Sequence, residues 1–396
     1  MSVALSRKWF TCTPKEFGGA EDFFARDSGL LSRALKANGV ESMAVMPGLR
    51  KPEDLDELIR TDYANLESAE WWKSHGLDGV VLYAWGSPRY RKIAAAIRMA
   101  GIFLILNQDN GGLVSPLAGF SLWLREQWNH AGKGRGIASY LRFLKLTAKG
   151  LSYCLLHTDP GRAAHLRNGD RISCVSPFAA ECYRKLCTIY GGEVLAKKVK
   201  VLPHPVESRF YYDGRSKKRQ IVTVGRWQDT LQKRPWLLAE VVTALTTSDK
   251  DLHIVIAGQS TPELDCWHSE LPGDCRRRIV LRGLTDRETL ADLMADSQIF
   301  YSPSAFESFG IAAAEALCCG SSVVAGRSVS MPSFDWFVSE NSGTLAVPDT
   351  ASAHIAALRC ELDKWDSGQR APARISEIWC RRVHAENVAA QVLAMK

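Results

Sequence analysis

The sequence predicts an α/β protein with two Rossmann-like domains, each built on a doubly wound parallel sheet. At 396 residues, the chain exceeds what one hydrophobic core usually organises, so two domains are expected. Short apolar runs alternate with segments of helical periodicity in both halves, which is typical of parallel sheets covered by helices. A charged stretch with two prolines, near 203–218, separates the halves. We expect domains over 1–203 and 204–372 and a C-terminal helix over 373–396.

Strands and helices follow one another through the first half. The apolar run LDGVVLYAWG lacks alternation, as expected for a strand that is covered on both faces. Ser87 followed by Pro88, and Ser176 followed by Pro177, are typical helix starts. We predict strands at 2–10, 41–48, 77–86, 102–108, 153–158 and 171–176, and helices at 20–39, 51–60, 87–101 and 176–191.

The second half repeats this order with clearer boundaries. Its strands are rich in β-branched residues, and its helices end at glycine or serine. We predict strands at 220–227, 251–259, 278–284, 297–304 and 321–326, and helices at 233–248, 286–297 and 309–320.

Residues 121–153 interrupt the alternation and predict one or two helices with a basic, aromatic face. The aromatic and basic side chains of this stretch are Trp123, Trp128, Tyr140, Phe143, Arg125, Lys133, Arg135, Arg142, Lys145 and Lys149.

Composition places the chain among ordinary globular proteins. It is 46% apolar and 23% charged, which excludes disordered and collagen-like classes. The net charge of +7 suits an anionic ligand or surface and does not require nucleic acid. No signal-peptide core and no run of roughly 18 apolar residues is present, so we expect a cytoplasmic protein that meets membranes only at their surface. The eleven cysteines contain no C-x-x-C pair, which argues for reduced thiols and against a zinc site.

Residues 302–326 hold the strongest chemical pattern. A predicted strand ends at Pro303, a short loop holds Glu307, and a helix begins near Gly310 with Glu315 in its second turn. A strand-to-helix turn offers unpaired backbone N–H groups and a positive dipole end to a phosphate. The two glutamates lie eight residues apart, so they can reach different parts of one extended ligand.

This segment, PSAFESFGIAAAEALCCGSSVV, resembles the E-x(7)-E signature of retaining glycosyltransferases of family four, the glycosyl transferases group 1. The resemblance implies the GT-B fold, two Rossmann-like domains facing across a cleft with the last helix crossing back to the first domain. It also implies that Glu307 contacts the donor sugar near the reacting carbon and that Glu315 binds the ribose hydroxyls. The N–H groups of Ser308, Phe309 and Gly310 would face the distal phosphate. The alternative is an ordinary βα unit with a solvated Glu307 and a salt-bridged Glu315.

A second pattern, VTVGRWQDTLQKRP, places Gly225 and Arg226 after a predicted strand and Lys233 at the next helix. By the same resemblance, Arg226 and Lys233 would bind the donor diphosphate, with Lys233 preferred over the neighbouring Arg234. Two fixed cations can stabilise the departing diphosphate without a metal ion. The resemblance also places the nucleotide base near three further residues, Gly258, Gln259 and Leu284.

The first half offers weaker site signals. Gly18 and Gly19 follow the first strand, where the resemblance places a turn that meets donor phosphate and acceptor. Family members often have a histidine after the fourth strand, whereas this chain has Asp109 there. Asp109 is therefore a candidate acceptor-side catalytic residue, and its alternative is a turn-forming Asp-Asn-Gly. His157 is a further alternative.

The resemblance implies a hexosyltransferase that moves a sugar from a nucleoside-diphosphate sugar to a hydroxyl of a sugar or lipid-linked acceptor, with retention, in polysaccharide or glycolipid assembly. We expect no cofactor and no essential metal, because the only Asp-x-Asp triplet, Asp54–Asp56, lies in the acidic helix predicted at 51–60. Two rivals stay open, a nucleotide-sugar epimerase of the same fold and a non-catalytic nucleotide-sugar-binding protein. Residues 121–153 would dock on anionic membrane or cover the acceptor cleft as a solvated helix.

Overall fold

The computed structural model describes residues 7–131, 136–339 and 341–396, and the chain divides into two compact units. The first unit contains the residues up to Pro205 together with Ala385–Lys396, and the second contains Val206–His384. The division after Pro205 lies two residues beyond the expected boundary, within the proline-containing stretch.

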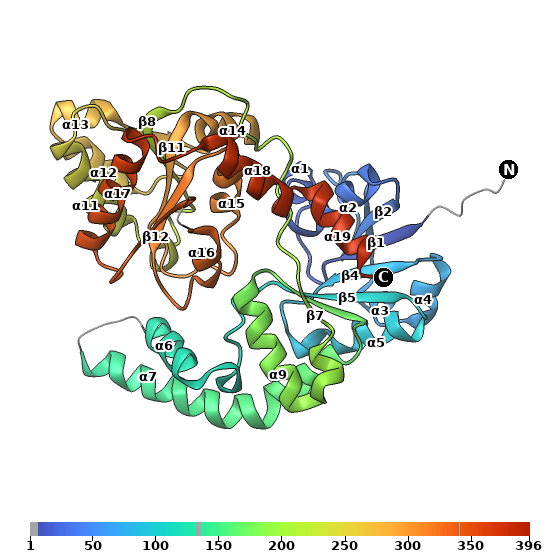
Figure 1. The fold of residues 1–396 in the computed structure, drawn as a ribbon. Coiled ribbons are helices and arrows are strands. Elements are labelled where there is room, and N and C mark those ends of the chain that lie inside the picture. Colours follow the sequence, from blue (N-terminus) through green and yellow to red (C-terminus); the bar gives the residue numbers. More distant parts are fainter. Residues whose placement is uncertain (1–6, 132–135, 340) are drawn as a thin grey trace. The chain divides into compact units, whose positions relative to one another are not determined.

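The first unit is built on a seven-stranded parallel sheet (Figure 1). Its strand order is β3-β2-β1-β4-β5-β6-β7, so the winding reverses between the central strands β1 and β4. Open α/β sheets bind ligands at the carboxyl ends of strands beside such a reversal. The strands are β1 Lys8–Cys12, β2 Glu41–Pro47, β3 Leu58–Thr61, β4 Gly79–Tyr83, β5 Phe103–Gln108, β6 Arg171–Cys174 and β7 Val199–Val201.

Helices cover both faces of this sheet, and the expected serine caps form. The Ser87 hydroxyl accepts from the Arg89 N–H, and the Ser176 hydroxyl accepts from the Ala179 N–H. The helical segments are α1 Glu21–Phe24, α2 Asp27–Ala37, α3 Tyr63–Leu66, α4 Ala69–Ser74, η1 Pro88–Tyr90, α5 Arg91–Met99, η2 Pro116–Ala118, α6 Phe120–His130, α7 Ile137–Lys149, η3 Gly150–Thr158, α8 Asp159–Leu166 and α9 Pro177–Ala196.

Three predictions in the first half are wrong. The helix expected over 20–39 is interrupted and forms α1 and α2, because Asp27 has a left-handed backbone (φ 51°). The acidic helix expected at 51–60 is a turn leading into β3, because Asp54 accepts hydrogen bonds from the Lys51 N–H and from Arg60 and so closes the turn. The strand expected at 153–158 is part of the π-helix η3. Its short apolar run fits either conformation, and the preceding helix continues through Gly150 without a turn.

The second unit has a six-stranded parallel sheet in the order β10-β9-β8-β11-β12-β13, with its reversal between β8 and β11. Buried residues on one face of this sheet share a core with helices, and other helices of the unit also contact its strands. The Rossmann-like architecture predicted from the sequence is thereby confirmed. The strands are β8 Lys218–Val224, β9 His253–Ala257, β10 Ile279–Gly283, β11 Ser297–Ser302, β12 Ser322–Gly326 and β13 Gly343–Ala346. The helices are α10 Thr230–Lys233, α11 Pro235–Ser248, α12 Pro262–Glu270, α13 Gly273–Arg278, α14 Arg287–Asp296, α15 Ile311–Cys318, α16 Pro332–Phe337, α17 Ala351–Asp366 and α18 Pro372–Val383.

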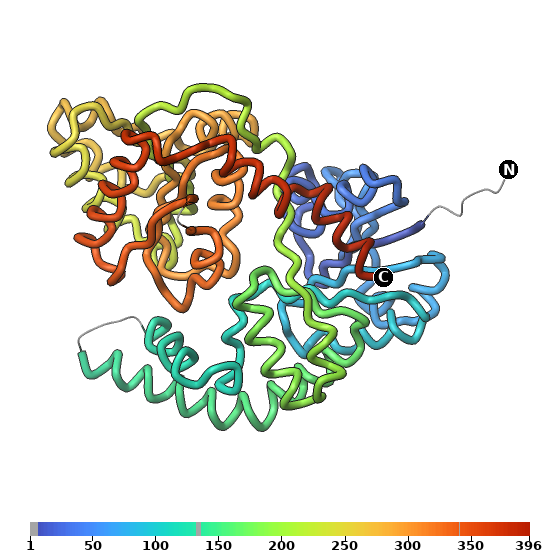
Figure 2. The backbone as a smooth tube through the Cα atoms, in the orientation of Figure 1, coloured from blue at the N-terminus to red at the C-terminus, as the bar shows by residue number. Residues whose placement is uncertain are grey.

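The C-terminal segment is two helices, where the sequence predicted one over 373–396. Helix α18 packs against α15 in the second unit, and α19 Ala385–Ala394 packs against α2 in the first (Figure 2). The break falls at His384, whose backbone is extended (φ −56°, ψ 138°). Apolar residues recur at helical spacing through both helices, from Ile375 to Leu393, and this explains why periodicity alone did not reveal the break.

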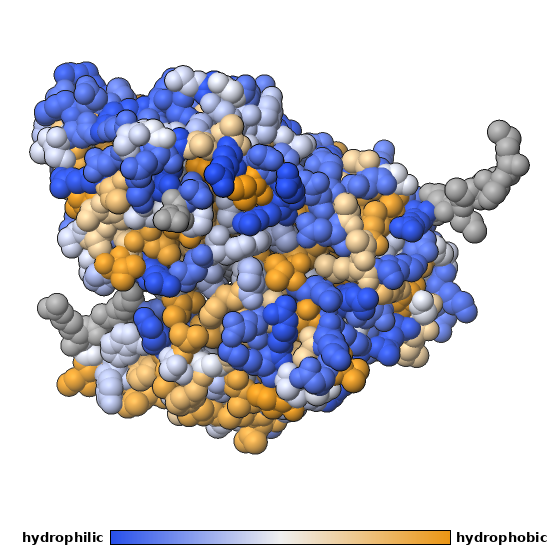
Figure 3. Space-filling model, viewed as in Figure 1, coloured by the Kyte–Doolittle hydropathy of each residue, from blue (hydrophilic) through white to orange (hydrophobic). Residues whose placement is uncertain are grey.

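Helices α6 and α7 and the segment η3 present a largely exposed surface, and no residue of α7 or η3 is buried. Apolar side chains gather along the lower edge of Figure 3, where α7 and the segment after it lie. Lys133 and Arg135 of the predicted basic stretch lie outside the described residues. Among the described residues, no helix has both the length and the apolar character needed to span a bilayer.

Candidate functional site

The predicted donor residues of the second unit gather at the carboxyl ends of β8 and β11, on either side of the reversal of the sheet. Gly225 and Arg226 follow β8 directly, and Pro303 follows β11. Glu307 lies in the loop between β11 and α15, and Gly310 is the residue that precedes α15. The topology thus places these residues where doubly wound sheets bind ligands.

The Glu307 carboxylate forms an ion pair with the Lys233 ammonium, and both side chains are 15% exposed. Ser304 Oγ donates to the same Glu307 oxygen at 3.0 Å. The Glu307 N–H donates to the Ser330 carbonyl at 2.9 Å, which fixes the loop backbone. The side chains of Glu307 and Lys233 are therefore in contact and held in place by hydrogen bonds, although they lie 74 residues apart in sequence.

Gly310 has φ 89° and ψ 62°, a left-handed conformation that favours glycine. A Cβ atom here would lie 2.8 Å from Phe334, so the ring packs directly on this backbone. The Gly310 carbonyl accepts from the Ala313 and Ala314 N–H groups. Of the three N–H groups that the resemblance assigned to the phosphate, that of Gly310 adjoins α15, and those of Ser308 and Phe309 lie in the loop before it. Helix geometry leaves open the amides ahead of Ala313, those of Gly310, Ile311 and Ala312. They can receive an anion.

Arg234 has a structural role that separates it from Lys233. Its guanidinium forms two hydrogen bonds with the Asp349 carboxylate, both 2.9 Å, and also donates to the Ser304 carbonyl at 2.9 Å. Asp349 in turn accepts from His354 Nε2 at 2.9 Å. Arg234 also has a left-handed backbone, φ 45°. This clamp ties the start of α11 to the end of β11, so it positions both Lys233 and Glu307.

Arg226 is exposed, and no ion pair of its guanidinium is found within the described part of the chain. The turn that presents it depends on close backbone packing. A Cβ atom at Gly258 would lie 1.9 Å from the Gly225 carbonyl oxygen, and the Gly258 N–H donates to the Gly283 carbonyl at 2.8 Å. These glycines thus bring the ends of three strands together and leave the Arg226 side chain accessible to a ligand.

Glu315 is buried (2% exposed) and forms an ion pair with Arg287 at 2.7 Å. Arg287 also pairs with Glu207 at 2.6 Å and lies over the Phe210 ring. The salt-bridged arrangement that the sequence left open as the alternative is therefore present. This pair fixes the position of the Glu315 carboxylate.

The residues predicted to meet the nucleotide base lie at the same edge of the sheet. Gln259 is exposed, and its carbonyl accepts from Gln228 at 3.3 Å. Leu284 follows β10 and is 81% exposed. An exposed leucine side chain beside a polar site can pack against the flat face of a bound base.

In the first unit, Gly18 and Gly19 differ in their surroundings. Nothing lies within 4 Å of a Cβ atom added at Gly18, whereas one at Gly19 would lie 2.2 Å from Asp54 Oδ1. Asp54 is held by Arg60, which also donates to the Phe17 carbonyl at 2.7 Å. The Asp54–Arg60 pair thus anchors this turn, and Gly18 is left facing a pocket.

That pocket, about 310 Å³ in volume, lies at the carboxyl ends of β1, β4 and β5. Two of its lining residues, Asp27 (φ 51°) and Trp85 (φ 48°), have left-handed backbones that are costly for residues other than glycine. Such strain concentrates at functional sites. The lining includes Thr13, Phe17, Gly18, Asp27, Trp85 and Asp109.

Asp109 is joined to a histidine that the sequence did not assign. His204 Nε2 lies 2.8 Å from Asp109 Oδ1, and His204 Nδ1 lies 3.2 Å from Asp27 Oδ1. Burial opposes the charged imidazole, yet the two carboxylates outweigh it and raise the pKa of His204 to about 9. A histidine from the interdomain stretch therefore holds two carboxylates that line the first-unit pocket. His157 lies outside it, in η3.

Comparison with known proteins bears on this arrangement. A family model described as Glycosyl transferases group 1 matches residues 218–363, the segment that contains the Lys233–Glu307 pair and the turn at Gly310. Residues 218–363 belong to the glycosyl transferases group 1 family. The family resemblance and the GT-B fold class predicted from the sequence are thereby confirmed. No curated protein sequence matches the chain.

Solved structures of this fold match nearly the whole chain. Anabaena HepE in complex with UDP is 13% identical with a TM-score of 0.62, and the match covers 98% of both chains. The lipopolysaccharide outer core galactosyltransferase WaaB is 14% identical with a TM-score of 0.61 and the same coverage. A Listeria monocytogenes protein proposed to be a UDP-N-acetylglucosamine 2-epimerase is 14% identical with a TM-score of 0.56, covering 98% of this chain and 95% of that one. At these identities the matches establish the fold.

Proposed function

We propose that this glycosyl transferases group 1 member is a retaining hexosyltransferase that uses a nucleoside-diphosphate sugar as donor. The observation that supports this most is the Lys233–Glu307 ion pair beside the open amides of Gly310, Ile311 and Ala312. The exposed Arg226 lies at the neighbouring strand end. The structural neighbour HepE, which is bound to UDP, supports a uridine nucleotide as the first donor to test.

In the proposed reaction, the α15 amides and Lys233 receive the distal phosphate, and Arg226 receives the diphosphate from the β8 side. The bond between the sugar C1 and the phosphate oxygen breaks, and the bond between C1 and the acceptor oxygen forms on the same face. The acceptor proton passes to the departing phosphate oxygen. Arg226 and Lys233 stabilise the negative charge that grows on the diphosphate, and no metal ion is needed for this. Glu307 orients the sugar, and Glu315 receives the ribose hydroxyls.

Site variants test this assignment. Glu307→Gln and Arg226→Ala are expected to lower the rate of sugar transfer about 10²-fold or more, since each removes a group that acts on the transition state. Glu315→Ala is expected mainly to weaken donor binding. Glu270→Gln and Arg277→Ala are matched controls, because both exposed residues lie beside the amino end of β10, at the opposite edge of the sheet. Normal transfer by Arg226→Ala would show that the donor site is assigned wrongly.

A nucleotide-sugar epimerase is the second candidate, because one structural neighbour is proposed to have that activity. Incubating the protein with each donor in the absence of acceptor separates the two. Isomerised nucleotide sugar would identify an epimerase, whereas free nucleoside diphosphate released only with acceptor supports transfer. Tight donor binding without either reaction would identify a binding protein. Full activity in excess chelator is expected, and its loss would contradict the metal-independent mechanism.

We also propose that the chain works at an anionic membrane surface, in polysaccharide or glycolipid assembly. Four exposed apolar residues, Ile137, Tyr140, Leu141 and Leu144, have the spacing of one helix face on α7. Arg142, Lys145 and Lys149 lie on the same helix, and Leu156 is 71% exposed just beyond it. Exposed apolar residues on a basic helix are typical of interfacial helices.

Vesicle binding tests this surface. Phosphatidylglycerol vesicles are expected to sediment the protein and phosphatidylcholine vesicles are not, and Leu141→Asp with Leu144→Asp should abolish sedimentation. Met99→Asp, at a residue that is 78% exposed on α5, is the control. If the double variant sediments as well as the parent protein, α7 does not dock on membrane.

A further inference from the structure

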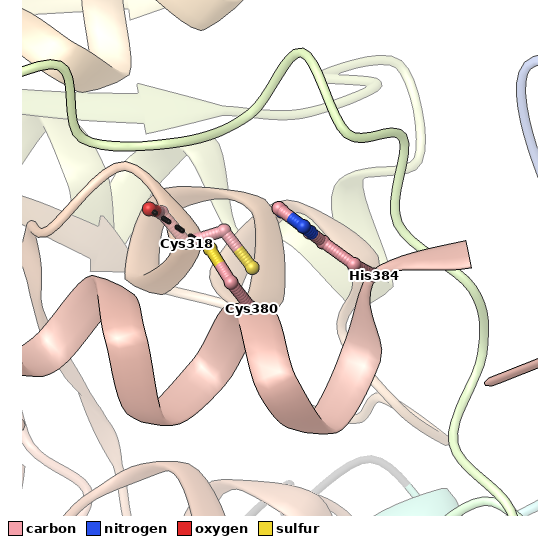
Figure 4. A group of neighbouring side chains, drawn as sticks. All are labelled: Cys318, Cys380 and His384. Atoms are coloured by element: carbon pink, nitrogen blue, oxygen red, sulfur yellow. Dashed lines mark hydrogen bonds between the residues drawn. The ribbon is translucent and has the colours of Figure 1, made fainter. Parts of the chain in front are cut away.

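A separate group of side chains gathers where α15 and α18 of the second unit pack together. Cys318 ends α15, Cys380 lies on α18, and His384 is the residue that follows α18. Their ligand atoms, two sulfurs and one ring nitrogen, all lie within 4.8 Å of one another (Figure 4). We propose that Cys318, Cys380 and His384 bind one borderline-soft divalent cation of the Zn²⁺ class.

The ligand atoms determine which class of metal ion the three side chains can bind. Two cysteine sulfurs and one imidazole are ligands that Zn²⁺ takes in tetrahedral sites. Mg²⁺ and Ca²⁺ prefer oxygen ligands and would be bound poorly here. Another group in the described part of the chain, Asp27, Asp109 and His204, also meets the distance criterion. There both imidazole nitrogens face carboxylates, so that histidine is already used in ion pairs.

The orientation of His384 is an independent observation in favour of metal binding. His384 Nε2 lies 2.9 Å from the Phe210 carbonyl oxygen. A carbonyl only accepts, so Nε2 holds a proton, and in the neutral imidazole Nδ1 then holds the lone pair that a metal ion requires. Metal-binding histidines almost always donate their other N–H to a carbonyl or carboxylate in this way.

Helix packing holds the two sulfurs together. The Ser376 hydroxyl of α18 donates to the Cys318 carbonyl at 2.5 Å, and Cys380 Sγ donates to the same carbonyl at 3.6 Å. A Cβ atom at Gly320 would lie 2.7 Å from the Pro372 carbonyl oxygen, so a glycine is needed for this approach of α18. Cys318 is buried while Cys380 and His384 are half-buried, and an ion would enter from their side.

The site would brace the edge of the second unit. The Val206 N–H donates to the Val383 carbonyl at 2.8 Å, and the Tyr212 N–H donates to Ser376 at 3.2 Å. An ion on His384 would therefore fix the segment 206–212 to α18 and to the end of α15. Its role is structural, and it is distinct from the metal-independent chemistry proposed for the donor phosphates.

Cobalt binding tests the proposal on the full chain, kept reduced with a phosphine. We expect one equivalent of Co²⁺ to give thiolate-to-cobalt charge-transfer absorption with the visible bands of a tetrahedral site, and Zn²⁺ to displace it. Cys380→Ser and His384→Gln should each weaken binding about tenfold or more and remove these bands. A Cys266→Ser, Cys360→Ser double variant should keep them, because both cysteines are exposed and outside the group.

Thermal unfolding gives a second readout. Zn²⁺ should raise the Tm of the parent protein and of the Cys266, Cys360 control, and should leave the Tm of Cys380→Ser and His384→Gln unchanged. Matching circular dichroism spectra of the variants would show that they fold. The proposal is overturned if the folded parent protein gives no thiolate–cobalt band, or if Cys380→Ser and His384→Gln bind cobalt as the parent does. Sugar-transfer activity does not enter either readout.

Discussion

Replacing Gly19 with alanine should destabilise the first unit, while the same change at Gly18 should not. The added methyl group at position 19 would lie 2.2 Å from Asp54 Oδ1 and 2.4 Å from Leu58 Cδ2, whereas at position 18 it meets nothing within 4 Å. Asp54 cannot retreat, because its buried carboxylate accepts two hydrogen bonds from Arg60, at 2.8 and 2.9 Å, and one from the Lys51 N–H. The Arg60 hydrogen bonds hold the pKa of Asp54 at about 2, so it stays ionised.

Overpacking of this kind costs about 1–3 kcal/mol. In a unit of this size, each kcal/mol lowers Tm by about 2–4 °C, so Gly19→Ala should lower the unfolding temperature of the first unit by about 2–12 °C. Gly18→Ala should stay within about 0.5 kcal/mol of the parent protein.

Differential scanning calorimetry can follow the two units, and sugar transfer gives a second readout. Gly18→Ala should fold normally and yet transfer sugar more slowly, since its methyl group would point into the first-unit pocket. If Gly19→Ala melts with the parent protein, or if both variants melt equally early, the steric reasoning is wrong.

Three further predictions concern the rest of both sites. The raised pKa of His204 means that its charged form stabilises the fold below about pH 6.5 and that this contribution is lost as pH rises to about 9. Between pH 6 and 9.5, the Tm of the parent protein should therefore fall more steeply than the Tm of His204→Gln. Equal slopes of Tm against pH in the two proteins would contradict this. Tyr83, which stacks on the His204 ring, stays neutral over this range because burial raises its pKa. Asp349→Ala leaves the Arg234 guanidinium, 11% exposed, without its carboxylate and should destabilise the second unit by about 3–5 kcal/mol. The control Asp335→Ala breaks an exposed ion pair with Arg327 and should destabilise the second unit by less than about 1 kcal/mol, as measured by scanning calorimetry. Equal destabilisation by the two variants would contradict the stabilising role of the Arg234–Asp349 pair. Leu284→Ala should leave Tm unchanged and weaken donor binding about three- to tenfold by titration calorimetry, from the loss of about 1 kcal/mol of apolar contact. Unchanged affinity would remove Leu284 from the base site.

The alternation of strands and helices predicted the central strands of both sheets because these elements are specified locally, whereas the edge strands β3, β7 and β13 were not predicted. Strands such as β8 and β11 are apolar runs bounded by turn residues, and α15 begins at a glycine with the required left-handed backbone. The candidate donor residues could be named from the sequence for the same reason. The motif at 303–326 is contiguous, so the residues near Gly310 needed no knowledge of distant contacts.

Contacts between distant segments were not predictable. His204 joins Asp27 and Asp109 only after the sheet has formed, and its place in a proline-containing stretch suggested a linker turn. The cysteine spacing likewise argued against a zinc site, because Cys318 lies far in sequence from Cys380 and His384. Only the packing of α15 against α18 brings the three side chains together. The four-residue spacing of Cys380 and His384 within the helix predicted over 373–396 was the available signal.

Local ambiguity explains the wrong elements. The acidic residues at 51–60 suit an exposed helix by composition, but Asp54 instead closes a turn with Arg60 and is buried. The run at 153–158 is too short for periodicity to separate strand from helix, and in the structure it continues the helical path that begins with α7.

A crystal structure with a bound sugar nucleotide tests the central claim most directly. The ligand should be the one that gives the largest thermal shift in a donor screen. We expect its distal phosphate to lie on the amides of Gly310, Ile311 and Ala312, with Lys233 and Arg226 contacting the diphosphate and Glu307 facing the sugar. A diphosphate bound elsewhere, or a Glu307 side chain that points away from the sugar, would contradict the account.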